Sequence, residues 1–497
     1  MRVLTTACAI LILATEVIAV GYFEYTPVAR QAYNQIFSLR FQEARSTLVQ
    51  LQVEEPDNLI LHSLHNYMDC LAIFIGERDD TYAQLRDRKH ERLSSIRGGD
   101  RGSPYYLYCQ ADIHLQWAIA RVKFEDYFQA VMEIKRAFQL LERNAALFPD
   151  FMPNKKNLGI LHALVGTVPD QFRWGLRLLG MSGTISQGKA EIEEVLHHAK
   201  TNDFVFRDEI YVMYAYLLLH LENQGEEAWN VLHRAKLDSQ KNPLSCFVMA
   251  NVAMQTGRNK VAIDLLKHKP SGDRYFPFPY LSFMEGVARL NRGDEDADEY
   301  LKIFLRHTKG KHYIKEAYQK LAWHAIIHDQ KSRYFSYLKA CKEQGAAVID
   351  EDISALNEAR ARQAPDRDLL MARVLFDGGY FQQAAAHLES IKSDQFQDPM
   401  LDLEYLYRLG RINDALHLYV KALNYYARTI EAGRYERHYF ACNAALKSGR
   451  IYESMQDMEA AIQHYELALS MHPDQYRASL HQKAKAGLLR ISEGISK

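Results

Sequence analysis

Apolar residues recur at intervals of three and four along almost the whole chain, and short turns interrupt them. One example places Tyr318, Leu321, Ala325 and Ile326 on one face of a helix that ends near Asp329. This spacing is typical of amphipathic helices, and no stretch alternates as a half-buried strand would. The pattern therefore predicts an all-α protein built from consecutive helices with short connections.

A longer periodicity lies on top of the helical one and is clearest near the carboxyl terminus. Small residues, aromatic residues and one proline follow a fixed spacing there: Ala445, Gly449, Tyr452, Ala461, Tyr465, Ala468 and Pro473. Small residues let two antiparallel helices approach, aromatic rings fill the wedge between them, and proline ends the second helix. The spacing resembles a tetratricopeptide repeat and predicts a superhelix of stacked helix pairs, an α-solenoid.

The same turn signal recurs along the chain. In each copy a small residue follows a turn residue by five positions: Leu39 with Ala44, Glu125 with Ala130, Gly257 with Ala262, Gly379 with Ala384, and Gly410 with Ala415. Gly293 is a weaker case, because Asp298 replaces the small residue. Glycine suits a helix end that needs a left-handed backbone conformation. We therefore expect helical repeats over residues 22–152 and 201–497, in one superhelix with an articulation near residue 200.

Residues 153–200 form an atypical segment between these repeats, most clearly at residues 153–196. Two apolar helices are expected there, interrupted by Pro169 and by glycines at Gly180, Gly183 and Gly188. These glycines permit tight turns and close contact between helices. The second helix is apolar on most sides, through Trp174, Leu178 and Leu179. We expect it to be buried inside the superhelix or against a partner, either as an internal plug or at the mouth of an apolar ligand or lipid groove.

This central segment resembles one known family. The residues that carry the resemblance are Gly159, Leu164, Pro169, Leu178, Leu179, Gly180, Met181, Gly183 and Gly188. Their order is similar to the helix, proline step, Leu-Leu helix and glycine turn of the Iml2 / tetratricopeptide repeat protein 39 family. The resemblance implies a helical-repeat fold without established catalysis, and a link to lipid or inclusion handling.

The amino terminus carries a separate signal. Arg2 precedes an apolar run over residues 3–14, and Ala19 and Gly21 provide small residues for a cleavage site. This predicts a signal peptide over residues 1–21 and an exported, periplasmic or membrane-associated protein. An uncleaved anchor and a first helix packed on the repeats are the alternatives. Membrane contact is expected only through this segment.

Charge and cysteine content narrow the possible partners. The chain has 61 basic and 62 acidic residues and a net charge of −1. Its overall charge therefore provides no electrostatic attraction to nucleic acid. The six cysteines are scattered without metal-ligand spacing: Cys8, Cys70, Cys109, Cys246, Cys341 and Cys442. We expect buried free thiols in place of disulfides or a metal site.

No catalytic signature stands out. The chain has neither the glycine-rich phosphate loop GxxxxGK[ST] nor a GxSxG nucleophile elbow. His324 and His328 are four residues apart on a predicted helix, beside Asp329, but no third metal ligand is identifiable. We interpret them as ordinary helix histidines and predict a protein that is not an enzyme and needs no cofactor. A metal-dependent enzyme remains the third hypothesis.

Candidate partner-binding residues follow from the repeat spacing. It places Asn251, Arg373, Glu404 and Arg450 at a position that commonly faces inward, where solvated residues are the alternative. The set lacks the Lys/Asn combination of a clamp for a carboxyl-terminal tail. The aromatic residues of the loop at 275–280 suggest either a rigid connector or a stacking platform.

The leading hypothesis is a scaffold in the cell envelope that binds a protein or peptide on its concave face. It rests on the repeats and on the lack of a catalytic signature. The alternative is an exported helical-repeat module for a lipid or glycan ligand, which rests on the apolar central segment and the aromatic loop.

Overall fold

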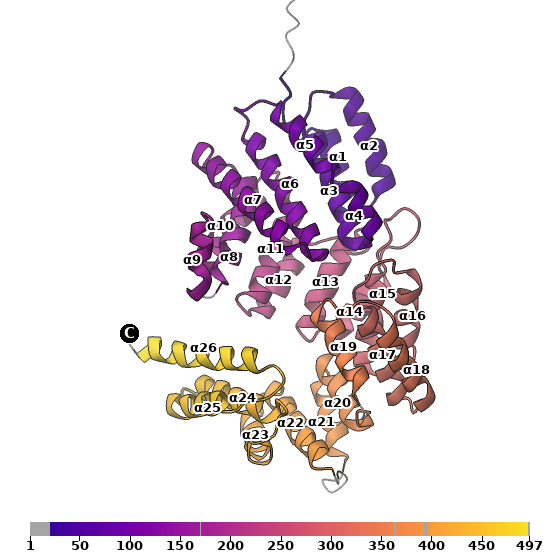
Figure 1. The fold of residues 1–497 in the computed structure, drawn as a ribbon, viewed down its shortest axis with the longest axis vertical. Helices are drawn as coiled ribbons and strands as arrows, with labels where there is room; N and C mark the ends of the chain where they lie inside the picture. The colour runs from indigo at the N-terminus through magenta and orange to yellow at the C-terminus, as the bar shows by residue number, and fades with distance from the viewer. Residues whose placement is uncertain (1–19, 169, 362–363, 392–395, 397, 496–497) are drawn as a thin grey trace, which may run out of the picture. The chain divides into compact units, whose positions relative to one another are not determined.

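The fold is all-α, as the apolar spacing predicts (Figure 1). The computed structural model describes residues 20–168, 170–361, 364–391, 396 and 398–495. Within these ranges the only β-type pairings are two isolated bridges, between Gly21 and Gly99 and between Tyr22 and Asn58.

The chain divides into two compact units. The amino-terminal unit comprises the residues up to Asn223 and residues 271–276, and the carboxyl-terminal unit comprises residues 224–270 and 277–497. The amino-terminal unit contains α1 (Pro27–Phe37), α2 (Phe41–Glu54), α3 (Ile60–Gly76), α4 (Asp79–Leu85), α5 (Arg88–Arg97), α6 (Pro104–Lys123), α7 (Tyr127–Leu147), α8 (Met152–Gly166), α9 (Asp170–Leu178), α10 (Ile185–Thr201) and α11 (Arg207–His220).

The carboxyl-terminal unit continues the same architecture. It contains α12 (Gly225–Ala235), α13 (Pro243–Gln255), α14 (Asn259–Lys267), α15 (Tyr280–Arg292), α16 (Ala297–His307), α17 (Ile314–Ile327), α18 (Lys331–Glu343), α19 (Asp350–Arg360), α20 (Arg367–Asp377), α21 (Phe381–Glu389), α22 (Pro399–Ala415), α23 (Tyr419–Gly433), α24 (Phe440–Ser454), α25 (Met458–Ser470) and α26 (Arg477–Ile495).

Helices pack as consecutive pairs, and the first helix of each pair also packs on the first helix of a following pair. In the amino-terminal unit this row of first helices is α1, α3, α6, α8 and α11. In the carboxyl-terminal unit it begins at α13, runs through α15, α17, α20, α22 and α24 and ends at α26. Such rows form the inner wall of a helical-repeat stack. We call them the inner walls of the two units.

The carboxyl-terminal pair confirms the predicted packing. Gly449 on α24 faces the ring of Tyr465 on α25, and a Cβ at position 449 would lie 2.8 Å from that ring. Ala461 and Ala468 are fully buried beside it. The helix ends at Ser470, before Pro473. A larger side chain at these positions would push the two helix axes apart.

The predicted turn residues adopt the left-handed conformation. Positive φ angles occur at Leu39 (56°), Glu125 (61°), Gly257 (71°), Gly293 (85°) and Gly379 (78°). After the turn at Gly379, the N–H of Tyr380 donates to the carbonyl of Leu375 at 2.9 Å. This bond satisfies a free carbonyl at the helix end, as in a Schellman motif. The turn signal is therefore confirmed at these positions.

The predicted turn at Gly410 is wrong. Gly410 lies inside α22, and the chain turns at His417, which has a φ of 58°. A Cβ on Gly410 would meet the ring of Tyr426, at 2.6 Å. The glycine therefore serves the close crossing of α22 and α23, as Gly449 does for the next pair. A turn and a close helix crossing both favour glycine, and the spacing alone did not distinguish the two.

The glycines of the central segment fix the position of α8. A Cβ on Gly159 would lie 2.7 Å from Ile192 on α10, and one on Gly183 would lie 2.6 Å from the backbone of His162. Gly188 faces the backbone of Gly159 on the same crossing. Gly180 forms a turn with a φ of 75°. The expected tight turns and helix contacts are thus confirmed.

The helix that follows Pro169 does not form the expected buried plug. In α9, Trp174 is 61% exposed and Leu178 is 77% exposed, and Leu179, just after the helix, is partly buried. The apolar composition of this helix therefore predicted burial inside the superhelix incorrectly at these positions. The neighbouring helices α8 and α10 contribute buried residues of the segment instead.

Two further expectations concern cysteines and membranes. Cys70, Cys109, Cys246, Cys341 and Cys442 are buried free thiols, as expected. Cys8 and residues 1–19 of the predicted signal peptide (residues 1–21) lie outside the described residues. Among the helices that the structure describes, none combines the length and apolar character needed to span a bilayer.

Candidate functional site

Cationic side chains gather on the inner wall of the carboxyl-terminal unit. They come from α20, α22, α24 and α26. The charges of Arg373, Arg408 and Arg411 act on Tyr439, and those of Arg411, Arg450 and Lys483 act on Lys447. We call this set the cationic wall: Arg373, Arg408, Arg411, Lys447, Arg450 and Lys483.

Aromatic rings hold the arginines of the cationic wall in place. The guanidinium of Arg411 lies 4.3 Å from the ring centre of Phe376, and that of Arg373 lies 4.4 Å from the ring centre of Trp323. Tyr407 accepts a hydrogen bond from Asn443 at 2.8 Å. Stacking on a ring fixes the plane of a guanidinium while leaving its N–H donors available. The wall is therefore organised before any ligand binds.

Acidic side chains balance only part of this charge. Arg408 pairs with Glu404, and Arg373 lies 3.9 Å from Asp377. Asp414 accepts a hydrogen bond from Tyr426 at 3.2 Å and lies near Lys447. The charge of Arg450 also acts on Glu453, which Arg490 binds at 2.8 Å. Four carboxylates thus lie beside the six cations. Within the described part of the chain, no ion pair involves Lys447, Arg450 or Lys483.

The neighbouring positive charges affect the pKa of Lys447. Burial, and then the positive charges of Arg411, Arg450 and Lys483, lower the pKa of Lys447 from 10.5 to about 8, against the opposing effect of Asp414. A lowered ammonium pKa means that the folded protein disfavours the charged form. Such uncompensated charge is more typical of a binding site than of a structural ion pair.

The four predicted inner-face residues lie on helices of the inner wall. Arg373, Glu404 and Arg450 lie on α20, α22 and α24, where the cationic wall is. Asn251 lies on α13, which packs on α15 and lies outside the cationic wall.

Sequence reasoning missed four members of the cationic wall: Arg408, Arg411, Lys447 and Lys483. Arg408 and Arg411 are four and seven residues after Glu404, and Lys447 is three residues before Arg450. Side chains three or four positions apart share a helix face. This spacing could have extended the predicted set to the first three of the missed residues.

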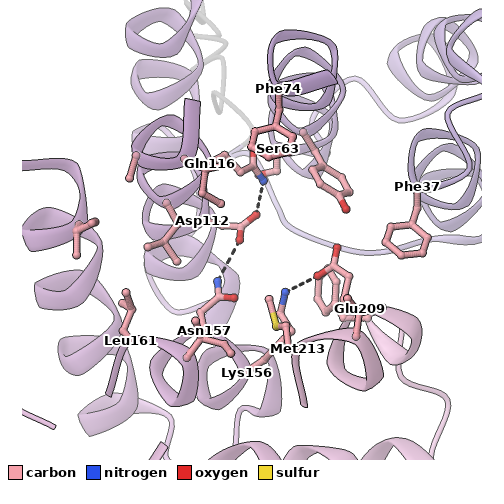
Figure 2. A pocket seen from close by; sticks show the side chains of 18 of the residues that line it. Phe37, Ser63, Phe74, Asp112, Gln116, Lys156, Asn157, Leu161, Glu209 and Met213 are labelled. Atoms are coloured by element: carbon pink, nitrogen blue, oxygen red, sulfur yellow. Dashed lines mark hydrogen bonds and ion pairs between the residues drawn. The ribbon is translucent and has the colours of Figure 1, made fainter. Parts of the chain in front are cut away.

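The amino-terminal unit contains a separate cavity on its own inner wall. Its volume is about 600 Å³, within the usual range of small-molecule sites. We call it the amino-terminal cavity (Figure 2). Side chains from five inner-wall helices line it, and most of them are apolar: Tyr33, Phe37, Leu64, Tyr67, Phe74, Leu115, Ile119, Val122, Ile160, Leu161, Leu164, Val212 and Met213.

Asp112 is the central polar group of the amino-terminal cavity. Asn157 donates to one carboxylate oxygen at 3.0 Å, and Gln116 donates to the other at 2.7 Å (Figure 2). Burial raises the pKa of Asp112, and the charge of Lys156 and these two amides only partly offset that effect. Within the described residues no cation lies at ion-pair distance from Asp112.

Glu209 and Lys156 form a closed pair in the same cavity. Their charged atoms lie 2.6 Å apart, and Tyr33 donates to Glu209 at 2.7 Å. Burial acts to raise the pKa of Glu209, but Lys156 and hydrogen bonds from Tyr33 and Tyr67 outweigh it and lower that pKa. Glu209 is therefore ionised and fully occupied by partners.

The cavity only partly follows the predicted apolar groove. Helix α8 lines it through Lys156, Asn157, Leu161 and Leu164, which lie in the predicted central segment. None of the side chains of α9 that the structure describes, at residues 174–178, lines it. The other walls come from helices of ordinary repeats, and no residue pattern in those helices predicted a cavity.

The histidine pair lies on α17 and its carboxyl end. The rings of His324 and His328 are 4.3 Å apart, and His324 Nε2 lies 3.0 Å from the carbonyl oxygen of Glu295. Burial, and then the neighbouring His328, lower the pKa of His324. Within the described part of the chain, no three His, Cys, Asp or Glu side chains are grouped so as to hold a metal ion.

The aromatic loop packs its rings on helices. Phe276 belongs to the amino-terminal unit, where its ring lies 4.8 Å from that of Phe41 and its N–H donates to Leu39 at 2.7 Å. Phe278 and Tyr280 belong to the other unit and pack on Phe247, with ring centres 5.7 and 6.0 Å away. These contacts fit the connector hypothesis and leave few ring faces for a platform.

Comparisons with known proteins add little beyond the fold. No protein-family model matches the chain, and no curated protein matches its sequence. Solved structures that it resembles include the tetratricopeptide domain of P58(IPK), the Cut9–Hcn1 assembly and yeast Tom70. Nothing among these matches supports the resemblance of the central segment to the Iml2 family.

The structural matches are weak in detail. The P58(IPK) domain is 17% identical, with coverage of 83% of this chain and 97% of that chain and a TM-score of 0.21. The Cut9 structure is 12% identical, covering 93% and 99%, with a TM-score of 0.24. Tom70 is 12% identical, covering 95% and 91%, with a TM-score of 0.25. At these values none of them transfers a partner or an activity to this chain.

Proposed function

We propose that the protein is a non-enzymatic scaffold that binds an acidic segment of a partner protein on the cationic wall. The observation that carries this proposal is the excess of cations on one inner wall, six against four carboxylates. Carboxylate side chains of a partner would supply the missing negative charge. Ring-stacked arginines suit this task because their N–H donors match the geometry of a carboxylate.

An acidic protein segment fits the wall better than a nucleic acid. The protein as a whole carries a net charge of −1, so it offers no extended positive field to a long polyanion. Its surplus of cations is confined to four neighbouring helices, which suits a short segment. The proposed location is the cell envelope, and it rests on the apolar residues at 1–21 alone.

Fluorescence anisotropy with a short labelled peptide tests the proposal. The peptide alternates Glu and Asp with Leu and Phe, and its control carries Gln and Asn at the acidic positions. We expect the acidic peptide to bind the full-length protein at least about tenfold more tightly than the amide control, and more weakly as salt is raised. Equal binding of the two peptides would refute the proposal.

A pair of variants assigns the binding to the wall. Arg450→Glu with Lys447→Gln removes two exposed or partly buried cations and should weaken the acidic peptide by at least about tenfold. Lys421→Glu with Arg428→Glu changes two exposed cations on α23, away from the inner wall, and should leave binding unchanged. A single-stranded oligonucleotide that binds more tightly than the peptide would favour a nucleic-acid partner instead.

A further inference from the structure

The amino-terminal cavity has an unbalanced charge at its polar end. Its charged groups there are Asp112, Glu209 and Lys156, so two carboxylates face one ammonium. That ammonium is already bound to Glu209, at 2.6 Å. Asp112 is left with two neutral amide donors, Asn157 and Gln116. A cation placed beside Asp112 would restore neutrality.

Aromatic rings surround this polar end. Tyr25, Tyr33 and Phe206 pack edge to face, with ring centres 5.5 Å apart for Tyr25–Phe206 and for Tyr33–Phe206. The ammonium of Lys156 already lies 4.5 Å from the ring centre of Phe206. Ring faces attract ammonium groups and repel carboxylates. The rings around Asp112 therefore favour a cationic group electrostatically, as the charge of the Asp112 carboxylate does.

The rest of the cavity wall is mostly apolar and partly open to solvent. Its one other charged residue among the lining side chains that the structure describes is Lys123, which pairs with Glu77 at 2.5 Å. Ile119 and Val122 on α6 are 52% and 50% exposed, and Leu164 on α8 is 50% exposed. All three line the same cavity. Exposed aliphatic side chains that meet around one hollow are typical of a ligand site, because a hydrocarbon chain would remove them from water.

We propose that the amino-terminal cavity binds a single-chain amphiphile with a protonated amine as its head. The amine would donate hydrogen bonds to Asp112, and the hydrocarbon chain would lie along Ile119, Val122 and Leu164. The volume of about 600 Å³ suits one small ligand. This site shares no residue with the cationic wall. The proposal is therefore independent of the proposed scaffold function.

Isothermal titration calorimetry on the full-length protein tests the head group. The probes are dodecylamine, dodecanol and dodecanoate, each below its micelle concentration. We expect dodecylamine to bind with one site per chain and at least about tenfold more tightly than dodecanoate, with dodecanol between them. Equal or tighter binding of dodecanoate would overturn the proposal, as would a lack of binding by all three.

Three variants locate the site. Asp112→Asn keeps the shape of the side chain and should remove the preference for dodecylamine over dodecanol. Leu164→Trp alters a half-exposed position and should weaken all three probes by obstructing the chain. Asp150→Asn changes an exposed carboxylate of the same unit and should change nothing. A preference for the amine that survives Asp112→Asn would show that the amine binds elsewhere.

A lysine-rich apolar peptide serves as the competing occupant. We expect it not to displace dodecylamine, because the cavity holds one narrow chain. If the peptide binds and dodecylamine does not, the cavity is a docking site for a partner protein and the proposal is wrong.

Discussion

At the scale of the residue, Lys447 carries a cost that the fold does not need. It lies partly buried on α24 among Arg411, Arg450 and Lys483, and Asp414 is the carboxylate that acts on it. Folding places its ammonium in an environment that disfavours the charge. A residue that weakens the fold in this way is explained if its charge serves binding, because stability and function often compete at such sites.

Lys447→Met should therefore stabilise the protein and weaken its binding of the acidic peptide. Because the folded pKa of about 8 lies below the ordinary 10.5, the charge costs stability at neutral pH, and the cost disappears as pH rises from about 8 to above 10.5. We expect a gain of about 1–3 kcal/mol at pH 7, allowing for partial exposure.

Urea unfolding of both proteins at pH 7 and pH 10 checks this prediction. The difference between variant and wild type should shrink at the higher pH. A variant that is less stable at pH 7, or a difference that does not depend on pH, would contradict the assigned environment of Lys447. Lys421→Met, on the exposed face of α23, is the matched control and should have little effect.

At the scale of the element, single small residues decide how closely helices and turns approach. Gly379 ends α20 with a φ of 78°, and a Cβ there would lie 2.7 Å from the Cα of Gly257. The turn after α13 thus touches the turn after α20, although the two are far apart in sequence. Nearby, Asn259 donates to the carbonyl of Ala288 at 2.6 Å.

Gly379→Ala should destabilise the carboxyl-terminal unit by about 2–4 kcal/mol. Left-handed strain contributes about 1–2 kcal/mol and the overlap with Gly257 adds the rest. Gly180→Ala is the matched control, since Gly180 has a φ of 75° but open space around its Cβ position. It should cost only the strain. Denaturant unfolding of the two variants measures the difference, and equal losses would show that the contact between the turns is unimportant.

The same elements show what a sequence pattern can and cannot predict. The turns at Leu39 and Glu125 were predictable because each lies five positions before a small residue, as in the other repeats, although neither Leu nor Glu favours the left-handed conformation by itself. Gly410 was misassigned because a glycine at a helix crossing and a glycine at a helix end look alike in sequence. Trp174 was predicted to be buried because its helix is apolar, yet burial depends on which helices lie opposite, and it is 61% exposed.

At the scale of the whole molecule, each unit presents an inner wall with its own chemistry. Arg373 and Arg450 were predictable as inward-facing positions from the repeat spacing alone. The charge excess around them was not, because it arises from α20, α22, α24 and α26 together. The amino-terminal cavity was not predictable for the same reason, since six helices spread over residues 27–220 line it.

The most direct test of the scaffold function is site-specific photocrosslinking in the native host. Benzoylphenylalanine replaces Arg450 on the inner wall or, as a control, Arg428 on the exposed face of α23. We predict that position 450 crosslinks one partner through a segment rich in Asp and Glu, that Lys447→Gln reduces this crosslink, and that position 428 does not give it. The same proteins crosslinked at both positions, or segments without an acidic excess at position 450, would contradict the account.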